Sequence, residues 1–246
     1  MNRRVLCLHA HPDDAEILTG GTLVRLAAAG HHLTIVSMTS GDCGSDELGP
    51  EETARIRRKE AAQAAALIGA EYHSLGFSDL AIFVDDGSRR RVTAALRRFR
   101  PDLILTASPR DYHCDHEATS LLVRDACFGA PAPNYRTAEG KPLPAIPHLY
   151  FADAVGGGDE RPDIVVDVTA QMETKRALLE CHASQRAWLK RQHSIEDYLE
   201  QMARWTAARG ALAGFAYGEG FRQHRGHPWP ATPLLEELLG GGYQRL

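Results

Sequence analysis

Short apolar runs that alternate with longer helical patterns are the feature that most limits how this chain can fold. The apolar runs predict strands over 3–10, 32–39, 71–76, 102–108, 147–153 and 163–168. Helical patterns fill the intervals at 20–30, 51–70, 88–100 and 117–128. Strands that alternate with helices form right-handed βαβ units, which build a mostly parallel sheet with helices on both faces. We therefore expect an α/β fold, a Rossmann-like three-layer sandwich.

The whole chain, residues 1–246, is expected to form one domain with a helical C-terminal third from about residue 169. Residues 129–147 are rich in proline and predict an irregular connection. Helices are expected at 169–183 and 194–213, and the tail holds at most one short helix. A chain of 246 residues is long enough for one large α/β domain with a substantial core.

Charge and cysteine content exclude several classes of protein. The chain has 28 Lys and Arg against 32 Asp and Glu, a net charge of −4, which argues against nucleic acid as a partner. Five cysteines, an odd and low number, argue against a disulfide scaffold and favour a reducing, cytoplasmic location. No stretch approaches the roughly 18–20 apolar residues that span a bilayer, so no membrane partner is expected.

Residues able to do chemistry follow two of the predicted strands. Sheets of this kind bind ligands beyond the carboxyl ends of the strands where the strand order reverses. In the common order 3-2-1-4-5, strands 1 and 4 flank that point. The segment HAHPDDAE (9–16) follows the first strand and RDYHCDH (110–116) follows the fourth. The topology therefore predicts that the two segments, about a hundred residues apart in sequence, face each other.

Imidazoles and carboxylates that face each other suit a metal site. These groups are good ligands for Zn²⁺, and Fe²⁺ can occupy a site of nitrogen and oxygen donors as well. A catalytic zinc usually keeps three protein ligands and one open position, where the pKa of water falls to about 7. The neighbours Asp13 and Asp14 point in different directions on an extended chain, so one could bind metal while the other acts as a base.

The two segments resemble motifs of the LmbE-like/PIG-L family of zinc-dependent N-acetylglucosaminyl deacetylases. HPDDAE after the first strand, GGTL in the following helix and HCDH after the fourth strand carry the resemblance. Further matches are Arg57-x-x-Glu60, Lys175, the segment HASQ (182–185) and the segment YGEGF (217–221). The C-terminal third looks most similar to bacillithiol-type members.

The resemblance implies a role for each motif residue. In the family, the histidine and second aspartate of HPDD and the last histidine of HxDH bind one zinc ion, which here are His11, Asp14 and His116. Asp13 then corresponds to the general base and His113 to the acid and oxyanion partner. The resemblance further implies that Asp115 orients His113 and keeps it protonated.

Substrate contacts are the part of the motif where this chain departs from some relatives. Arg57 matches an arginine that contacts substrate in the family. Some relatives carry a carbonyl-polarising tyrosine two residues before HxDH, where this chain has Asp111, with Tyr112 beside it. Tyr217 in the late motif is a second candidate for that task. His9 alternates with His11 along the strand and is expected to pack rather than to bind.

The resemblance thus implies an enzyme, a zinc-dependent N-deacetylase that releases acetate and a free amine from a small N-acetylglucosamine conjugate. A deacetylase of chitobiose-type or other acetamido compounds is the alternative within the family. A metal-dependent phosphoesterase and a non-catalytic binding protein on the same fold are alternatives outside it. Bacillithiol-type and chitobiose-type members often form hexamers, so a homo-oligomer is compatible with the resemblance.

Overall fold

A computed structural model describes residues 2–156, 161–193 and 197–246. The strands are β1 Arg4–His9, β2 His32–Thr39, β3 Glu71–Phe77, β4 Leu103–Thr106, β5 His148–Ala152, β6 Ile164–Asp167, β7 Gly218–Gln223 and β8 Tyr243–Arg245. The α-helices are α1 Asp14–Ala28, α2 Pro50–Leu67, α3 Asp86–Phe99, α4 Cys114–Gly129, α5 Met172–Glu180, α6 Ala183–His193, α7 Tyr198–Ala211 and α8 Leu234–Leu239. A 3₁₀ turn, η1, covers Thr169–Gln171.

In the part of the chain that the structure describes, the strands form one eight-stranded sheet in the order β3-β2-β1-β4-β5-β7-β6-β8. Strands β1 to β5 pair in parallel. Strands β6, β7 and β8 join the sheet through antiparallel pairs. The predicted Rossmann-like α/β class with a mostly parallel sheet is confirmed, and the first five strands follow the expected order.

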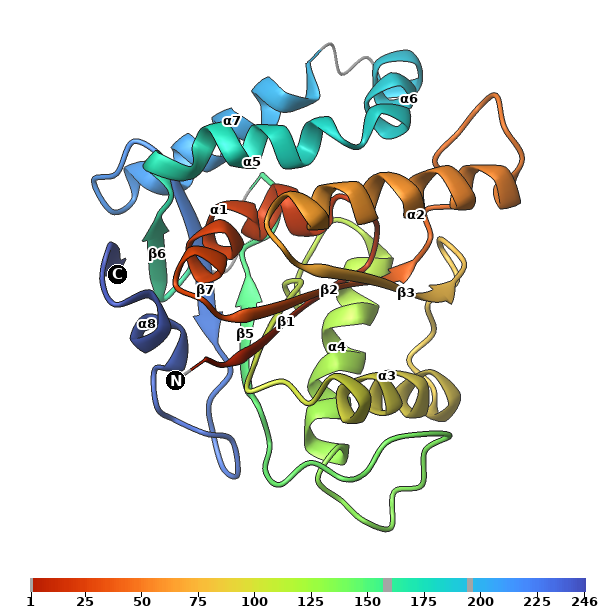
Figure 1. The fold of residues 1–246 in the computed structure, drawn as a ribbon, viewed down its shortest axis with the longest axis vertical. Coiled ribbons are helices and arrows are strands. Elements are labelled where there is room, and N and C mark those ends of the chain that lie inside the picture. Colours follow the sequence, from red (N-terminus) through yellow and green to blue (C-terminus); the bar gives the residue numbers. More distant parts are fainter. Residues whose placement is uncertain (1, 157–160, 194–196) are drawn as a thin grey trace.

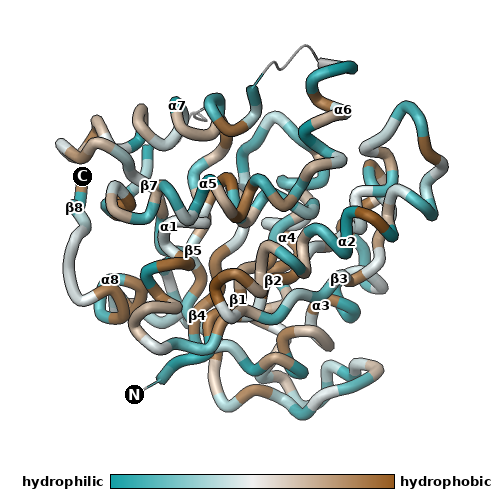
Figure 2. Tube along the Cα trace, turned by 45° about the horizontal axis from the view of Figure 1, so that its top comes forward, coloured by the Kyte–Doolittle hydropathy of each residue, from teal (hydrophilic) through white to brown (hydrophobic). Residues whose placement is uncertain are grey.

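The sheet separates two apolar cores, as the alternation of side chains along a strand requires. In β1, Val5 and Cys7 face a core shared with α1, α2, α5 and α7. Leu6 and Leu8 face a second core shared with α3 and α4. Figure 1 shows α1, α2 and α5 on one side of the sheet and α3 and α4 on the other. The brown segments in Figure 2 show that the most hydrophobic stretches include the central strands β1 and β4.

The C-terminal third contains strands as well as the expected helices. Strand β7 lies between β5 and β6 and is almost wholly buried, although its sequence GEGFRQ has two glycines and few β-formers. A Cβ atom on Gly218 would lie 2.6 Å from Cγ1 of Val165, so the glycine permits close approach to the neighbouring strand. Pairing on both edges thus overrides the local preference. Strand β8 at the sheet edge was also not predicted.

The helix boundaries differ most from the sequence prediction at α1 and before α7. Helix α1 begins at Asp14, six residues before the predicted start at residue 20. The predicted helix 194–213 corresponds to α7, while its first residues, 194–196, lie outside the described residues. The region before it forms the separate helix α6. None of the helices in the described ranges is long and apolar enough to cross a membrane.

A buried ion pair fixes α1 against α5 and β7. Lys175 Nζ lies 2.6 Å from Glu219 Oε1 and donates to the carbonyl oxygen of Ile17 at 2.8 Å. The two carboxylate oxygens of Glu219 accept from the N–H groups of Gly21 and Thr22 at 2.8 Å each. The motif residues Lys175 and Glu219 therefore stabilise the helix that follows HPDD, and neither belongs to the chemical centre.

Candidate active site

The two predicted segments meet beyond the carboxyl ends of β1 and β4. These strands are neighbours, but α1 continues β1 on one face of the sheet and α4 continues β4 on the other. The loops after them diverge and leave a cleft between them, as expected at a switch point. His11 and Asp14 approach from the β1 side, and His113 and His116 approach from the start of α4.

The three residues that the resemblance assigns to zinc lie together. Nδ1 of His11 is 3.3 Å from Nε2 of His116. The carboxylate of Asp14 lies 3.5 Å from His11 Nδ1 and 3.4 Å from His116 Nε2. Two imidazole nitrogens and one carboxylate oxygen make the usual protein set for a catalytic zinc with an open fourth position. The residues present therefore fit a divalent metal ion.

Carboxylates also face the outer nitrogens of both imidazoles. His11 Nε2 lies 3.1 Å from Oδ2 of Asp115, and His116 Nδ1 lies 3.0 Å from Oδ1 of Asp111. Both carboxylate side chains are almost fully buried. A carboxylate on the outer nitrogen fixes the tautomer and the direction of a metal-binding histidine. Asp111 was expected to contact substrate; in the structure its buried carboxylate faces Nδ1 of His116, and Asp111 is not among the described residues that line the cavity of the site.

The charges at this site favour a cation. Although burial opposes ionisation, the neighbouring His116 and His11 hold the pKa of Asp14 well below its usual range. Burial also opposes protonation of His11, yet hydrogen bonds to Asp115 and Asp14 raise its pKa to about 9. The carboxylates that stabilise imidazolium here would equally stabilise a bound divalent cation in the same place.

Asp13 occupies a strained position beside the proposed ligands. Its φ of 104° is in the left-handed region, at the N-terminus of α1. Arg57 Nη2 lies 3.3 Å from Oδ1 of Asp13, and the Tyr198 hydroxyl donates to Oδ2 at 3.3 Å. Burial raises the pKa of Asp13 to about 6, and the charge of Arg57 limits the rise. A carboxylate held in this way is suited to accept a proton near neutral pH.

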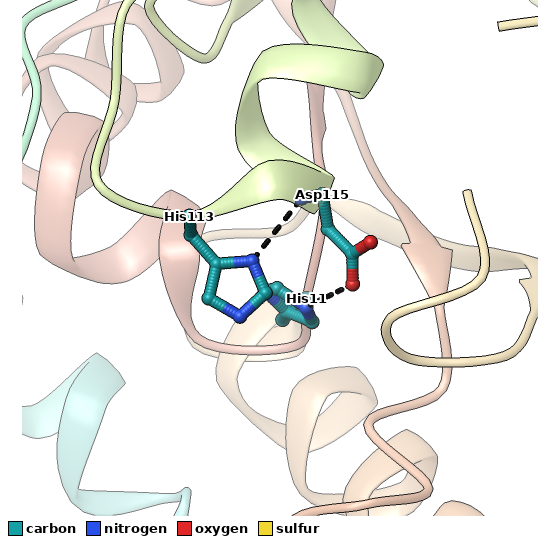
Figure 3. Close-up of side chains that lie close together, drawn as sticks. All are labelled: His11, His113 and Asp115. Atoms are coloured by element: carbon teal, nitrogen blue, oxygen red, sulfur yellow. Dashed lines mark hydrogen bonds and ion pairs between the residues drawn. The ribbon is translucent and has the colours of Figure 1, made fainter. Parts of the chain in front are cut away.

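The surroundings of His113 differ from the expectation. Its Nδ1 accepts the backbone N–H of Asp115 at 3.2 Å, whereas the Asp115 carboxylate faces His11 Nε2 (Figure 3). The same carboxylate accepts from the N–H of Leu80. The expectation that Asp115 keeps His113 protonated is therefore not met. Burial and the charges of His11 and His116 lower the pKa of His113. With Nδ1 accepting, the neutral ring carries its proton on Nε2 and acts as a hydrogen-bond donor.

The two tyrosines named from the sequence lie in different places. Tyr112 lines the cavity at the site and is 72% exposed. Tyr217 does not line this cavity; it precedes β7 and packs against the core beneath α1. Its carbonyl oxygen accepts from the N–H of Val168, a buried residue of that core. The suggestion that Tyr217 polarises the substrate therefore has no geometric support.

A cavity of about 680 Å³ opens beside the proposed ligands and includes residues that the sequence did not single out. Asp79 follows β3, and its buried Oδ1 has no hydrogen-bond partner in the described structure. Its position after a parallel strand was a signal that could have revealed it. Other lining side chains come from α6 and α7, and of these only Gln185, in the segment HASQ, was singled out from the sequence: Gln185, Trp188, Gln192, Tyr198 and Trp205.

Several known proteins resemble this chain in sequence and in fold. Residues 6–127 match the family model described as PIG-L, GlcNAc-PI de-N-acetylase. The chain is 29% identical to the diacetylchitobiose deacetylase of Thermococcus kodakarensis, over 89% of this chain and 82% of that protein. The solved diacetylchitobiose deacetylase from Pyrococcus horikoshii superposes with a TM-score of 0.81 at 28% identity, covering 94% of this chain and 88% of that one.

Two other relatives show that similar chains differ in the substrate or reaction that their names state. The probable N-acetyl-α-D-glucosaminyl L-malate deacetylase 2 of Bacillus anthracis is 28% identical over 82% of this chain and 91% of that protein. The expected special likeness to bacillithiol-type members is thus wrong, because this relative is less similar than the chitobiose enzyme. The 4-oxalmesaconate hydratase of Pseudomonas putida is 28% identical over 74% of each chain. Sequence match, shared fold and a clustered His/Asp site together show that the chain belongs to the PIG-L, LmbE-like family of N-deacetylases and is an enzyme of that amidohydrolase class.

Proposed function

We propose that this enzyme removes the N-acetyl group from a neutral N-acetylglucosamine-containing saccharide of the diacetylchitobiose type, releasing acetate and a free amine. We further propose one Zn²⁺ per chain, held by His11, Asp14 and His116. The observation that carries the proposal is the meeting of these three side chains beside Asp13 in a cavity of about 680 Å³. That volume lies within the range of small-molecule sites.

The lining of the cavity supports a neutral substrate. The rings of Trp188, Trp205 and Tyr198 offer apolar faces for the C–H groups of a sugar. Arg57 is the one lysine or arginine among the described lining residues. Its two terminal nitrogens are already bound, to Gly41, Pro12 and Asp13. A malate carboxylate or an inositol phosphate would therefore find no free arginine or lysine in this part of the described cavity.

A bound zinc would polarise the acetyl carbonyl and lower the pKa of water. Asp13 lies next to the ligand set and accepts the proton of the attacking water, while Arg57 and Tyr198 keep its carboxylate in place. The Nε2–H group of His113 donates a hydrogen bond to the oxyanion, which forms on the former carbonyl oxygen of the acetyl group. The proton taken up by Asp13 is then available for the leaving amine.

The test is an acetate-release assay on the zinc-loaded enzyme with four substrates: diacetylchitobiose, N-acetylglucosamine, N-acetylglucosaminyl-malate and N-acetylglucosaminyl-inositol. We expect the highest kcat/KM for diacetylchitobiose. The D13A variant should keep its zinc and lose about 10²–10⁴-fold in kcat, the usual contribution of a general base. Turnover restricted to the malate conjugate would contradict the neutral substrate, and normal turnover by D13A would contradict the base.

The alternative activities differ from the deacetylase in the products and the metal content that we expect to measure. The hydratase among the relatives suggests a second candidate activity, in which the same acid and base groups add water to a carbon–carbon double bond. Hydration of an unsaturated dicarboxylic acid without acetate release from any sugar would favour that activity. Two metal ions per chain would favour a phosphoesterase, since such sites use two metals. Metal analysis of the purified enzyme also separates zinc from iron, and metal binding without turnover of any substrate would favour a binding protein.

A further inference from the structure

Leu80 has a backbone conformation that a leucine does not favour. Its φ is +61°, and the only other non-glycine residues with positive φ in the described parts of the chain are Asp13 and Arg100. Asp13 belongs to the chemical centre, and Arg100 ends helix α3 in the usual left-handed cap. Leu80 serves neither purpose. A branched, bulky residue at positive φ is strained and points to a local demand of function.

Hydrogen bonds to residues of the active site fix the strained conformation of Leu80. The N–H of Leu80 donates to Oδ2 of Asp115 at 2.7 Å, and the same oxygen lies 3.1 Å from His11 Nε2. On the other side, the N–H of Asp79 donates to Oδ1 of Asp42 at 2.7 Å. Two carboxylates thus clamp this turn beside the metal ligands, and the position of Leu80 is defined relative to them.

The side chain of Leu80 is poorly buried by the described residues and gains little stability from burial. It is 63% exposed while lining the same cavity as His113 and His116. Exposed Tyr112 lines the cavity too, with its ring centre 5.9 Å from that of His113. The proposed metal ligands are nearly buried, so Leu80 and Tyr112 stand at the mouth of the cavity. The described residues leave most of this strained leucine uncovered, and a bound substrate can cover it.

We propose that Leu80 is a specificity-determining residue that packs on the sugar unit attached to the N-acetylglucosamine ring undergoing deacetylation. This inference rests on the proposed function. The acetamido group must reach the buried ligands, so the part of the substrate at the mouth is the part farthest from the reacting bond. A second pyranose presents there a face of C–H groups, which suits an aliphatic side chain and a tyrosine ring.

Two substitutions of Leu80 separate its side chain from its backbone strain. L80A removes the side chain but keeps a Cβ atom at positive φ, whereas L80N keeps a similar size and tolerates the left-handed region. Both variants should raise KM for diacetylchitobiose about tenfold, the effect of losing burial of one aliphatic side chain, with kcat within about twofold. The loss should be at least about fivefold smaller for N-acetylglucosamine, which lacks the second ring.

The melting temperature of L80N distinguishes a role in substrate binding from a purely structural role, because a structural role for Leu80 predicts a lower Tm in this variant. L80N should raise Tm by about 2–4 °C because strain is relieved, and L80A should not. The matched control is R100G, which also relieves a left-handed residue, at the end of α3 far from the cavity, and should leave both KM values unchanged.

Three results would overturn the proposed role of Leu80. Equal losses for the mono- and disaccharide, or a lower Tm for L80N, would overturn it. A changed oligomer mass of L80N with unchanged substrate preference would assign Leu80 to a subunit interface and also overturn it. Absence of acetate release from either sugar by the wild-type enzyme would instead refute the proposed function.

Discussion

At the scale of single residues, the site depends on which carboxylate faces which imidazole nitrogen. His11 and His116 each turn one nitrogen toward Asp14 and the other toward a buried carboxylate, Asp115 or Asp111. This arrangement holds the two rings in the direction that a metal needs before any metal binds. Asp111 and Asp115 are therefore positioning residues in our interpretation.

The variants D111N and D115N test this interpretation. Each should weaken zinc affinity about 10–100-fold, because an amide orients the imidazole less firmly than a carboxylate does. Competition with a zinc chelator measures the affinity. D125N, which changes a surface carboxylate on the same helix α4, is the matched control and should bind zinc as the wild type does. Wild-type affinity in D111N would show that the contact with His116 does not support the metal.

At the scale of elements, the position of α1 decides whether Asp13 and Asp14 reach the site. The helix starts directly at HPDD and is held from behind by the buried pair of Lys175 and Glu219. A Cβ atom on Gly21 would lie only 2.5 Å from Cβ of Val168, so the helix also needs its glycine to approach the segment before α5. The late motifs of the sequence thus act through the first helix.

Breaking the buried pair should be costly. K175M leaves the carboxylate of Glu219 buried without its counter-charge and should lower the unfolding free energy by about 3–5 kcal/mol. The double variant K175M/E219L should be less destabilised than the sum of the two single variants, since no lone charge remains. Urea unfolding measures all three. The exposed pair of Arg55 and Glu52 on α2 is the control, and R55A should change stability little. Additive effects of the two buried substitutions would contradict the coupling.

At the scale of the whole molecule, stability depends on pH through a histidine outside the proposed ligand set. His9 is buried at the end of β1, and neither ring nitrogen has a hydrogen-bond partner in the described structure. Burial lowers its pKa to about 4 from the ordinary 6.5. Between these pH values the unfolded chain binds a proton that the folded chain does not. The stability from neutral His9 is therefore present above pH 6.5 and is lost as pH falls toward 4.

Chemical unfolding of the chelator-treated protein at pH 7 and pH 4 tests this dependence. The wild type should lose about 3 kcal/mol more between the two pH values than H9N, which cannot take up the proton. The exposed His32, changed to Asn, controls for loss of a histidine as such. The same loss in H9N and in the wild type would show that other groups cause the acid sensitivity.

The amino-acid sequence was sufficient to predict much of the frame and the candidate ligands. The order of the first five strands follows from alternating apolar runs, because burial on both faces and right-handed crossovers leave few topologies. The placement of His11, Asp14 and His116 after strands 1 and 4 follows from the same rule. These properties depend on short stretches of sequence and on general chirality, so they can be read without coordinates.

The remaining features depend on contacts between segments far apart in sequence, and the tertiary structure alone decided them. Strand β7, rich in glycine, is a strand because two neighbours pair with it. The carboxylate of Asp115 faces His11 rather than His113, and the N–H of Leu80, from the turn after β3, donates to the same oxygen and holds it there. Tyr198 reaches Asp13 only because α7 packs against α5 and β7, which places its first residue beside Asp13 at the start of α1. Hydrogen bonds and packing at this range are set by the relative placement of whole elements, which no local pattern encodes.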